Sequence, residues 1–213
     1  PKPQNPKFSL LKFKIESFLS ASSMATEVSK AVIFVFCISI MWMGVGIVQL
    51  PMFYPLVALE KGVPGIYIGL VLSLRPMTGL IFTPIINRYI MVVGLEPSIL
   101  FGGLIYSCCF IGFAFVTKIE NANTFVAVSF LIQIFTGVAQ TTLTIGEQCL
   151  LLRYSDKGER EKNLGMFRVA SGLGGLISPI LGSLMYACGG FMAAFISVGV
   201  GYLFICPWIY FKL

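Results

Sequence analysis

The sequence contains no histidine. Histidine is the side chain that most often binds metal ions and exchanges protons near neutral pH, so its absence removes most metal sites and most acid–base enzymes from consideration. For the same reason the chain has no serine–histidine or cysteine–histidine pair for nucleophilic catalysis. We therefore expect no enzyme activity, no catalytic residue, no bound metal ion and no cofactor.

Charged residues are also scarce. They make up 11% of the chain, whereas an ordinary soluble domain carries about 25%. Hydrophobic residues make up 57%, and a globule of 213 residues with this composition could not cover itself with polar surface. We infer that the chain lies in a lipid bilayer. The net charge of +6 then reports the orientation of the loops, and we expect no nucleic-acid partner.

The six cysteines have no metal-ligand spacing, and all lie in or at the ends of apolar runs. We interpret them as free, small side chains of the protein interior. They are Cys37, Cys108, Cys109, Cys149, Cys188 and Cys206.

Apolar runs dominate the rest of the chain. A spanning helix needs about 20 apolar residues, and six runs of about that length or more are separated by short polar or glycine- and proline-bearing breaks. The runs lack the alternating pattern of a membrane β-barrel, so the sequence predicts an all-α membrane protein with a six-helix domain over residues 31–213. The predicted helices are 31–59, 66–93, 97–117, 124–152, 164–187 and 190–211.

Residues 1–30 form a separate N-terminal segment without the pattern of a signal peptide. Two alternatives fit this segment: an amphipathic helix lying on the membrane surface, or a disordered tail. Four apolar residues would share one face of such a helix: Phe8, Leu11, Ile15 and Phe18. The chain begins with proline rather than methionine, and we expect it to be part of a longer or processed protein.

Basic residues flank the predicted helices unevenly. Because lysine and arginine favour the cytoplasmic side of a membrane, we expect both termini to be cytoplasmic, in a vesicular, endomembrane or plasma membrane. Only Lys61 and Lys118 fall on the opposite side. The cytoplasmic set is Lys2, Lys7, Lys12, Lys14, Lys30, Arg88, Arg153, Lys157, Arg160, Lys162 and Lys212.

Arg75 lies nine residues into the predicted helix 66–93, about 14 Å from its start. A charge at such a depth costs about 2.5–3.5 kcal/mol on insertion scales and persists where it faces a cavity or a partner. Pro76 and Pro84 bend the same helix and free backbone carbonyls. Two interpretations stay open: Arg75 lies beside a path for a solute, or it braces the bundle.

Polar and small side chains follow in rows on two helices. Thr78, Gly79, Thr83 and Asn87 form a loose stripe beyond Arg75. A second row along helix 124–152 would either line a path or join helices through hydrogen bonds; it contains Gln133, Gly137, Gln140, Thr144 and Glu147. The residues we expect to line a solute path are Arg75, Gln49, Thr78, Gln133, Gln140 and Thr144.

The helix 164–187 carries small residues at helical spacing, which let another helix approach closely. These are Ser171, Gly175, Ser178 and Gly182. Arg168 lies about one turn inside the cytoplasmic end of this helix, at a depth similar to that of Glu147 on the antiparallel helix. We expect Glu147 and Arg168 to form a charge pair, because an unpartnered buried charge costs more than a pair. The alternative is that each side chain reaches water separately.

Three stretches resemble the N-terminal half of a major facilitator superfamily transporter, and within it the vesicular amine and polyamine transporters of the drug–proton antiporter branch. The first is LPMFYPLVALEKGVPGIYIG (50–69), and the second is the helix with Arg75 and Pro84, followed by Gly94. The third, SGLGGLISPILGSLMY (171–186), is similar to the antiporter motif G-x-x-x-G-P-x-x-G-G. In that motif Gly174, Pro179 and Gly182 match, whereas Ser178 and Ser183 replace glycines.

The sequence departs from this family at three places. The family's aspartate–arginine pair before Gly94 falls on Met91 and Val92, or on Asn87 and Arg88 in another alignment. The family's membrane arginine in helix 4 is replaced by Gln133, and the amine-binding aspartate of helix 1 by Met43.

The resemblance implies alternating access between two six-helix halves, with a small organic solute such as an amine, polyamine or drug-like molecule exchanged for protons. The implied partners are the solute, protons, the lipid bilayer and a second six-helix half in the same or another chain. The alternative is a transport-inactive six-helix subunit or scaffold derived from a transporter half.

Overall fold

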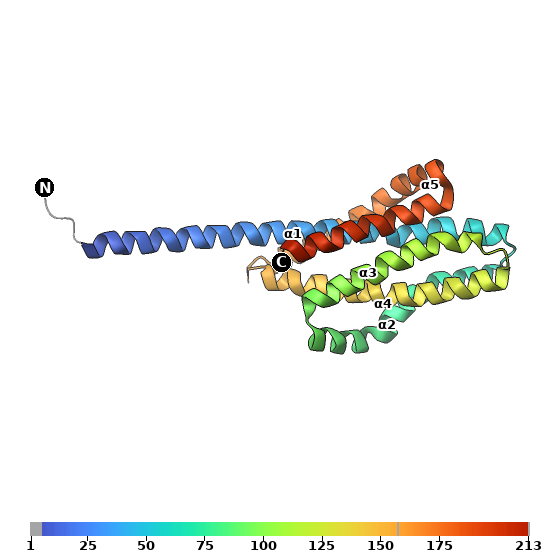
Figure 1. Cartoon of the computed structure of the whole chain (residues 1–213), viewed down its shortest axis with the longest axis horizontal. Helices are drawn as coiled ribbons and strands as arrows, with labels where there is room; N and C mark the ends of the chain where they lie inside the picture. Colours follow the sequence, from blue (N-terminus) through green and yellow to red (C-terminus); the bar gives the residue numbers. More distant parts are fainter. Residues whose placement is uncertain (1–5, 157, 213) are drawn as a thin grey trace.

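The structure, a computed structural model, describes the backbone of residues 6–156 and 158–212 and the side chains of residues 31–156 and 158–205. This part of the chain is helical and contains no strand. Figure 1 shows long helices packed side by side. The elements are α1 (Pro6–Glu60), α2 (Gly65–Val93), α3 (Leu95–Ala114), the short 3₁₀ helix η1 (Phe115–Lys118), α4 (Ala122–Tyr154) and α5 (Arg160–Lys212). The predicted surface helix within residues 1–30 falls on side chains outside this description and stays a prediction.

Five helices in the described part are long and apolar enough to cross a membrane, where the sequence predicted six separate helices. The difference lies in α5, which contains both predicted ranges 164–187 and 190–211. Its backbone leaves the helical region at Gly189 (φ −159°, ψ 24°) and Gly190 (φ 66°, ψ −158°), and Figure 1 shows α5 turning back on itself at its upper end. Glycine permits the positive φ of Gly190 because it has no Cβ.

The two parts of α5 pack along α1 in opposite directions. Gly174 lies against the backbone of Met41, and Gly182 lies further along α1, against Phe53. Beyond the turn, Gly201 lies against Trp42, whose indole Nε1 donates to the carbonyl of Val198 at 3.1 Å. The small residues of the first part therefore bring it close to α1, as their spacing predicts.

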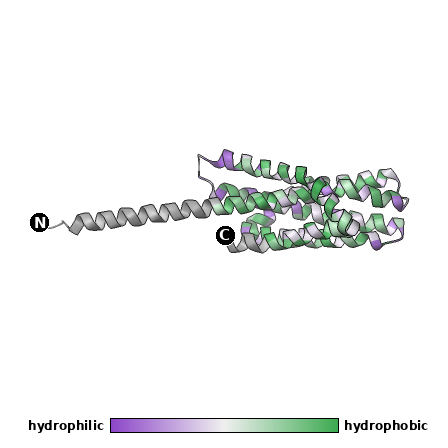
Figure 2. Cartoon of the chain, turned by 90° about the horizontal axis from the view of Figure 1, so that it is seen from above, coloured by the Kyte–Doolittle hydropathy of each residue, from purple (hydrophilic) through white to green (hydrophobic). Residues whose placement is uncertain are grey.

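The interior is built from aromatic rings and glycine contacts. Rings of α1, α3, α4 and α5 lie 4.3–6.1 Å apart between centroids. Hydrophilic residues gather mainly near the helix ends, whereas apolar residues cover most of the helix lengths (Figure 2). Large apolar side chains are exposed on α2 and on the first part of α5, including Leu80, Ile81, Leu176 and Ile180.

Candidate functional site: a pocket at Arg75 and a buried carboxylate

A pocket of about 580 Å³ lies between α1, α2 and α4. This volume is in the range of small-molecule sites, which enclose about 300–1,000 Å³. Its wall is mostly apolar and carries a few polar groups. The lining residues are Ile47, Leu50, Pro51, Leu72, Arg75, Pro76, Gly79, Leu80, Thr83, Gly137, Gln140 and Thr141.

Arg75 provides the charge of this pocket. Its side chain is 7% exposed, and its Nε donates to Oε1 of Gln133 at 3.1 Å. The guanidinium carbon lies 5.4 Å from the ring centroid of Phe110, a distance that allows a cation–π interaction. Within residues 31–156 and 158–205, the single ion pair shorter than 4.0 Å joins Lys162 to Glu159. No carboxylate of these residues therefore lies within 4.0 Å of Arg75. The positive charge therefore has no acidic partner in this part of the chain.

Close approach of α2 and α4 forms one side of the pocket. A Cβ added at Gly137 would lie 2.7 Å from the carbonyl oxygen of Arg75 and 3.0 Å from Cβ of Thr78. A Cβ at Gly79 would lie 2.6 Å from Oγ1 of Thr141. Gly137 is therefore needed for the present separation of the two helices, whereas the contact at Gly79 is with a threonine side chain. Pro76, in the pocket wall, cannot donate a backbone hydrogen bond, and this leaves a carbonyl of the preceding turn free.

The predicted path residues divide into three groups in the structure. Arg75 and Gln140 line the pocket, and Oε1 of Gln140 has no hydrogen-bond partner among the described residues. Gln133 is buried behind the wall and holds Arg75. The remaining three predicted residues are outside the lining set: Gln49, Thr78 and Thr144.

Sequence reasoning missed Thr141 as a pocket residue. Its Oγ1 donates to the carbonyl of Gly137 at 2.8 Å. Thr141 is four residues from Gly137, a spacing that places the two on one face, so it could have been found by extending the row of helix α4 from its glycine.

Glu147 lies in a second polar cluster, away from the pocket lining. Its side chain is fully buried, and its Oε1 accepts hydrogen bonds from Oγ of Ser39 at 2.6 Å and from the hydroxyl of Tyr202 at 2.9 Å. Those two hydroxyls are also 2.8 Å apart. This cluster joins α4 to α1 and to the second part of α5.

The predicted pair of Glu147 with Arg168 is not formed. Arg168 is exposed, and no ion pair within 4.0 Å involves either residue in the part of the chain that has described side chains. The two residues are at similar depths on antiparallel helices, but Glu147 faces α1 and the second part of α5. Hydroxyl groups of Ser39 and Tyr202 occupy the place at Oε1 that the prediction gave to the arginine.

The motif residues of helix α5 serve its packing on α1. Oγ of Ser178 donates to the carbonyl of Val45 at 2.8 Å. Gly174 meets the backbone of Met41, and a Cβ at Gly182 would lie 2.9 Å from the ring of Phe53. Pro179, by contrast, is exposed.

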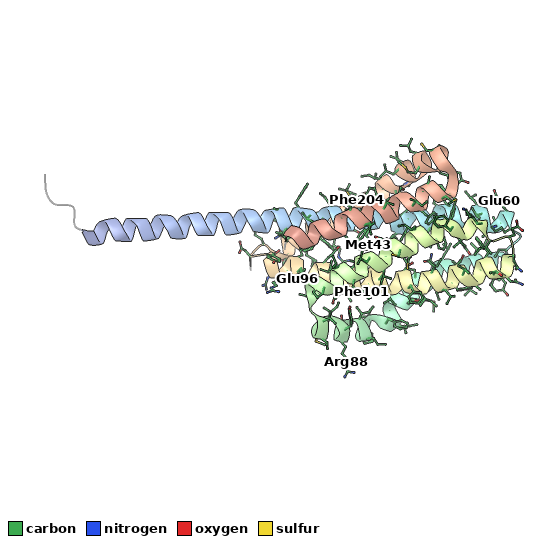
Figure 3. All side chains as sticks on the ribbon, in the orientation of Figure 1. Met43, Glu60, Arg88, Glu96, Phe101 and Phe204 are labelled. Carbon is green, nitrogen blue, oxygen red and sulfur yellow. The ribbon has the colours of Figure 1, made fainter. Side chains whose placement is uncertain are left out.

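Met43, which stands where the resembling family has an aspartate, is 1% exposed inside the bundle (Figure 3). Oγ1 of Thr144 lies 4.0 Å from its sulfur. Arg88 extends away from the bundle on α2 in the same view. Helix α1 therefore presents no acidic group at this position.

Comparison with known proteins adds the family. The sequence profile described as Major Facilitator Superfamily matches residues 13–213. The MFS-type transporter SLC18B1 of Homo sapiens is 22% identical over 155 residues, which cover 73% of this chain and 34% of the relative. The proteins of the same name from Mus musculus and Rattus norvegicus are 23% and 24% identical over the same shares. The chain thus spans about a third of these relatives and belongs to the Major Facilitator Superfamily.

Proposed function

We propose that this chain is the N-terminal half of a secondary transporter that moves a small organic solute by alternating access. The observation that carries the proposal is the pocket of about 580 Å³ between α1, α2 and α4, which contains the buried charge of Arg75. Transporters of this fold place their solute near the midplane, between two halves. The similarity to proteins named as MFS-type transporters supports the same class of function.

The two parts of α5 act, in this proposal, as separate spans, so that six helices cross the membrane. Their opposite directions along α1 and the non-helical backbone at Gly189 and Gly190 support this count. The exposed apolar faces of α2 and of the first part of α5 would then meet the second half or lipid.

The solute is proposed to be an amine, a polyamine or a drug-like molecule, exchanged for protons. Arg75 alone would repel a cation, so this solute class requires carboxylates from a second six-helix half beside the pocket. One of those carboxylates would also supply the missing partner of Arg75.

The test is solute uptake by the full-length protein in lipid vesicles. Replacing Arg75 with leucine removes the charge from the pocket, and we expect uptake to fall by roughly tenfold or more, equivalent to about 1.4 kcal/mol. Arg88→Leu on the exposed face of the same helix is the matched control. Equal uptake by the two variants would contradict the proposed role of Arg75.

A transport-inactive subunit or scaffold is the second candidate. Two observations favour it. The buried Met43 stands where the resembling family has an aspartate. Gln133, whose Oε1 accepts a hydrogen bond from Arg75, stands where the resembling family has an arginine. This candidate predicts that the full-length protein neither binds nor moves any member of an amine and polyamine panel, although it folds and reaches the membrane.

A further inference from the structure

The cluster of Glu147, Ser39 and Tyr202 has three oxygen–oxygen contacts of hydrogen-bond length. Its two hydroxyl groups supply only two protons for them. Three pairs of oxygen atoms lie within hydrogen-bond distance: Ser39 to Glu147 at 2.6 Å, Tyr202 to Glu147 at 2.9 Å, and Ser39 to Tyr202 at 2.8 Å. If Glu147 is ionised, only the two hydroxyl protons are available, and both are donated to Oε1. The contact between Ser39 and Tyr202 then has no proton.

A proton on the carboxyl group completes this cluster. With that proton on Oε1, each of the three oxygens can donate once and accept once around the triangle. The other carboxyl oxygen, Oε2, is buried and has no hydrogen-bond partner among the described residues, an arrangement that suits a neutral carbonyl oxygen better than a shared negative charge.

No positive charge among the described side chains balances Glu147. Within residues 31–156 and 158–205 no lysine or arginine lies within 4.0 Å of it. Arg75 does not pair with Glu147: its partner Gln133 precedes Glu147 by fourteen residues on α4, about 21 Å along the helix, although Tyr106 interacts with both charged groups. The titratable groups that interact with Glu147 are Cys37 on α1, Tyr106 on α3 and Tyr202 on α5, all of which are ordinarily uncharged at neutral pH.

Water can reach this carboxyl group only if helices move apart. Glu147 is fully buried. It lies eight residues before Ser155, which caps the C-terminal end of α4, so the carboxyl group is about 12 Å from that end along the helix. Its hydrogen-bond partners come from α1 and α5, so separation of α4 from either helix would break the cluster and expose the carboxyl group.

We propose that Glu147, Ser39 and Tyr202 form a proton-binding site that holds one proton while α1, α4 and α5 are packed together. The proton leaves to water when α4 separates from these helices, and one returns when they close. The site itself is a property of this chain. Its coupling to solute movement rests on the proposed transport function and gives Glu147 the role of proton carrier.

The first test is infrared difference spectroscopy of the full-length protein in lipid vesicles, taken between acidic and alkaline pH. We expect the carbonyl stretch of a protonated carboxyl group in the wild type and its loss in Glu147→Gln. Glu120→Gln, which changes an exposed loop carboxyl, is the control and should keep that band. The exposed carboxyl groups contribute equally to both proteins, so a band in Glu147→Gln as intense as that of the wild type would overturn the proposal.

Two further variants keep the proposal testable if Glu147→Gln fails to fold. Ser39→Ala and Tyr202→Phe each remove one hydroxyl, and we expect each to shift the frequency and the titration midpoint of the Glu147 band. An unchanged band in both variants would overturn the proposed site.

Transport measurements separate this inference from the proposed function. With Glu147→Gln we expect solute exchange without a pH gradient to continue, while uptake driven by a gradient is lost. Gradient-driven uptake equal to that of the wild type would overturn the role of Glu147 as proton carrier. If the wild type moves no solute, the transport proposal fails, and the infrared band still decides whether the proton site exists.

Discussion

At the scale of the residue, Arg75 shows how a charge is kept inside an apolar bundle. One hydrogen bond to Gln133 and the ring of Phe110 hold the guanidinium group, and the remainder of the group faces the pocket. Gln133 is thus a support for Arg75, although the sequence placed it on the path itself.

Removal of this support gives the first stability prediction. Gln133→Leu leaves Arg75 without its side-chain hydrogen bond, and a hydrogen bond to a charged group contributes about 1.5–3 kcal/mol. We expect the free energy of unfolding in detergent to fall by about that amount. Gln148→Leu, at a half-buried glutamine on the same helix, is the control. Equal losses in the two variants would show that Gln133 does not hold the arginine.

The residues of the site were only partly predictable. Arg75 could be found because a charge deep in an apolar run is costly, and Gln140 because it shares a row with other polar residues. The partners of Glu147 could not be found in this way. The depth of a residue along its helix follows from the sequence, but the rotation of the helix about its axis depends on packing. In the structure the rotation of α4 turns Glu147 towards Ser39 and Tyr202 and away from Arg168.

At the scale of the element, glycines determine how closely the helices approach. Gly137→Ala places a Cβ 2.7 Å from the carbonyl oxygen of Arg75, so α2 and α4 must separate. Overpacking of this kind costs about 1–3 kcal/mol, and we expect a lower unfolding temperature together with weaker solute binding. Gly172→Ala, where an added Cβ meets nothing within 4 Å, is the control. A Gly137→Ala protein with unchanged stability would contradict this contact.

The turn within α5 gives a second prediction at this scale. Gly190 has φ 66° and ψ −158°, a backbone conformation that is essentially restricted to glycine. Gly190→Ala should therefore destabilise the protein by about 1–3 kcal/mol in a thermal unfolding measurement. Gly165→Ala, a helical position with open space around it, should have little effect. The prediction fails if the two substitutions have similar effects.

The elements themselves follow from hydropathy more directly than the site does. The predicted range 66–93 and helix Gly65–Val93 differ by one residue at the start. The separation of 164–187 from 190–211 was inferred from the break at CGG, and the structure places the non-helical backbone at the two glycines of that break, inside α5. The number of helices depends on how this turn is counted.

At the scale of the whole molecule, the two ends of the bundle differ in charge. Helix α4 runs from Ala122 to Tyr154, about 50 Å. Lys61, which donates to the carbonyl of Ile119, marks the end of the bundle where α4 begins, and Ser155 marks the end where α4 stops. The uneven distribution of basic residues predicts that the Ser155 end is cytoplasmic.

Cysteine labelling tests this orientation in vesicles that expose a single face of the membrane. Asp156→Cys should react with a membrane-impermeant maleimide only from the cytoplasmic face, and Glu120→Cys, in an exposed loop at the opposite end, only from the other face. The unsubstituted protein measures the background from its own free thiols, such as Cys108 and Cys149. Reaction in the opposite order would reverse the proposed topology.

The packing of both parts of α5 on α1 has a consequence for biosynthesis. Helix α1 is translated before α5, yet it packs most extensively against α5, and its indole at Trp42 donates to the carbonyl of Val198. A nascent chain that has been translated only as far as Ser155 therefore holds α1 without its main neighbour. The indole of Trp42 gains its hydrogen-bond partner, and Gly174 meets the backbone of Met41, only after α5 has been translated.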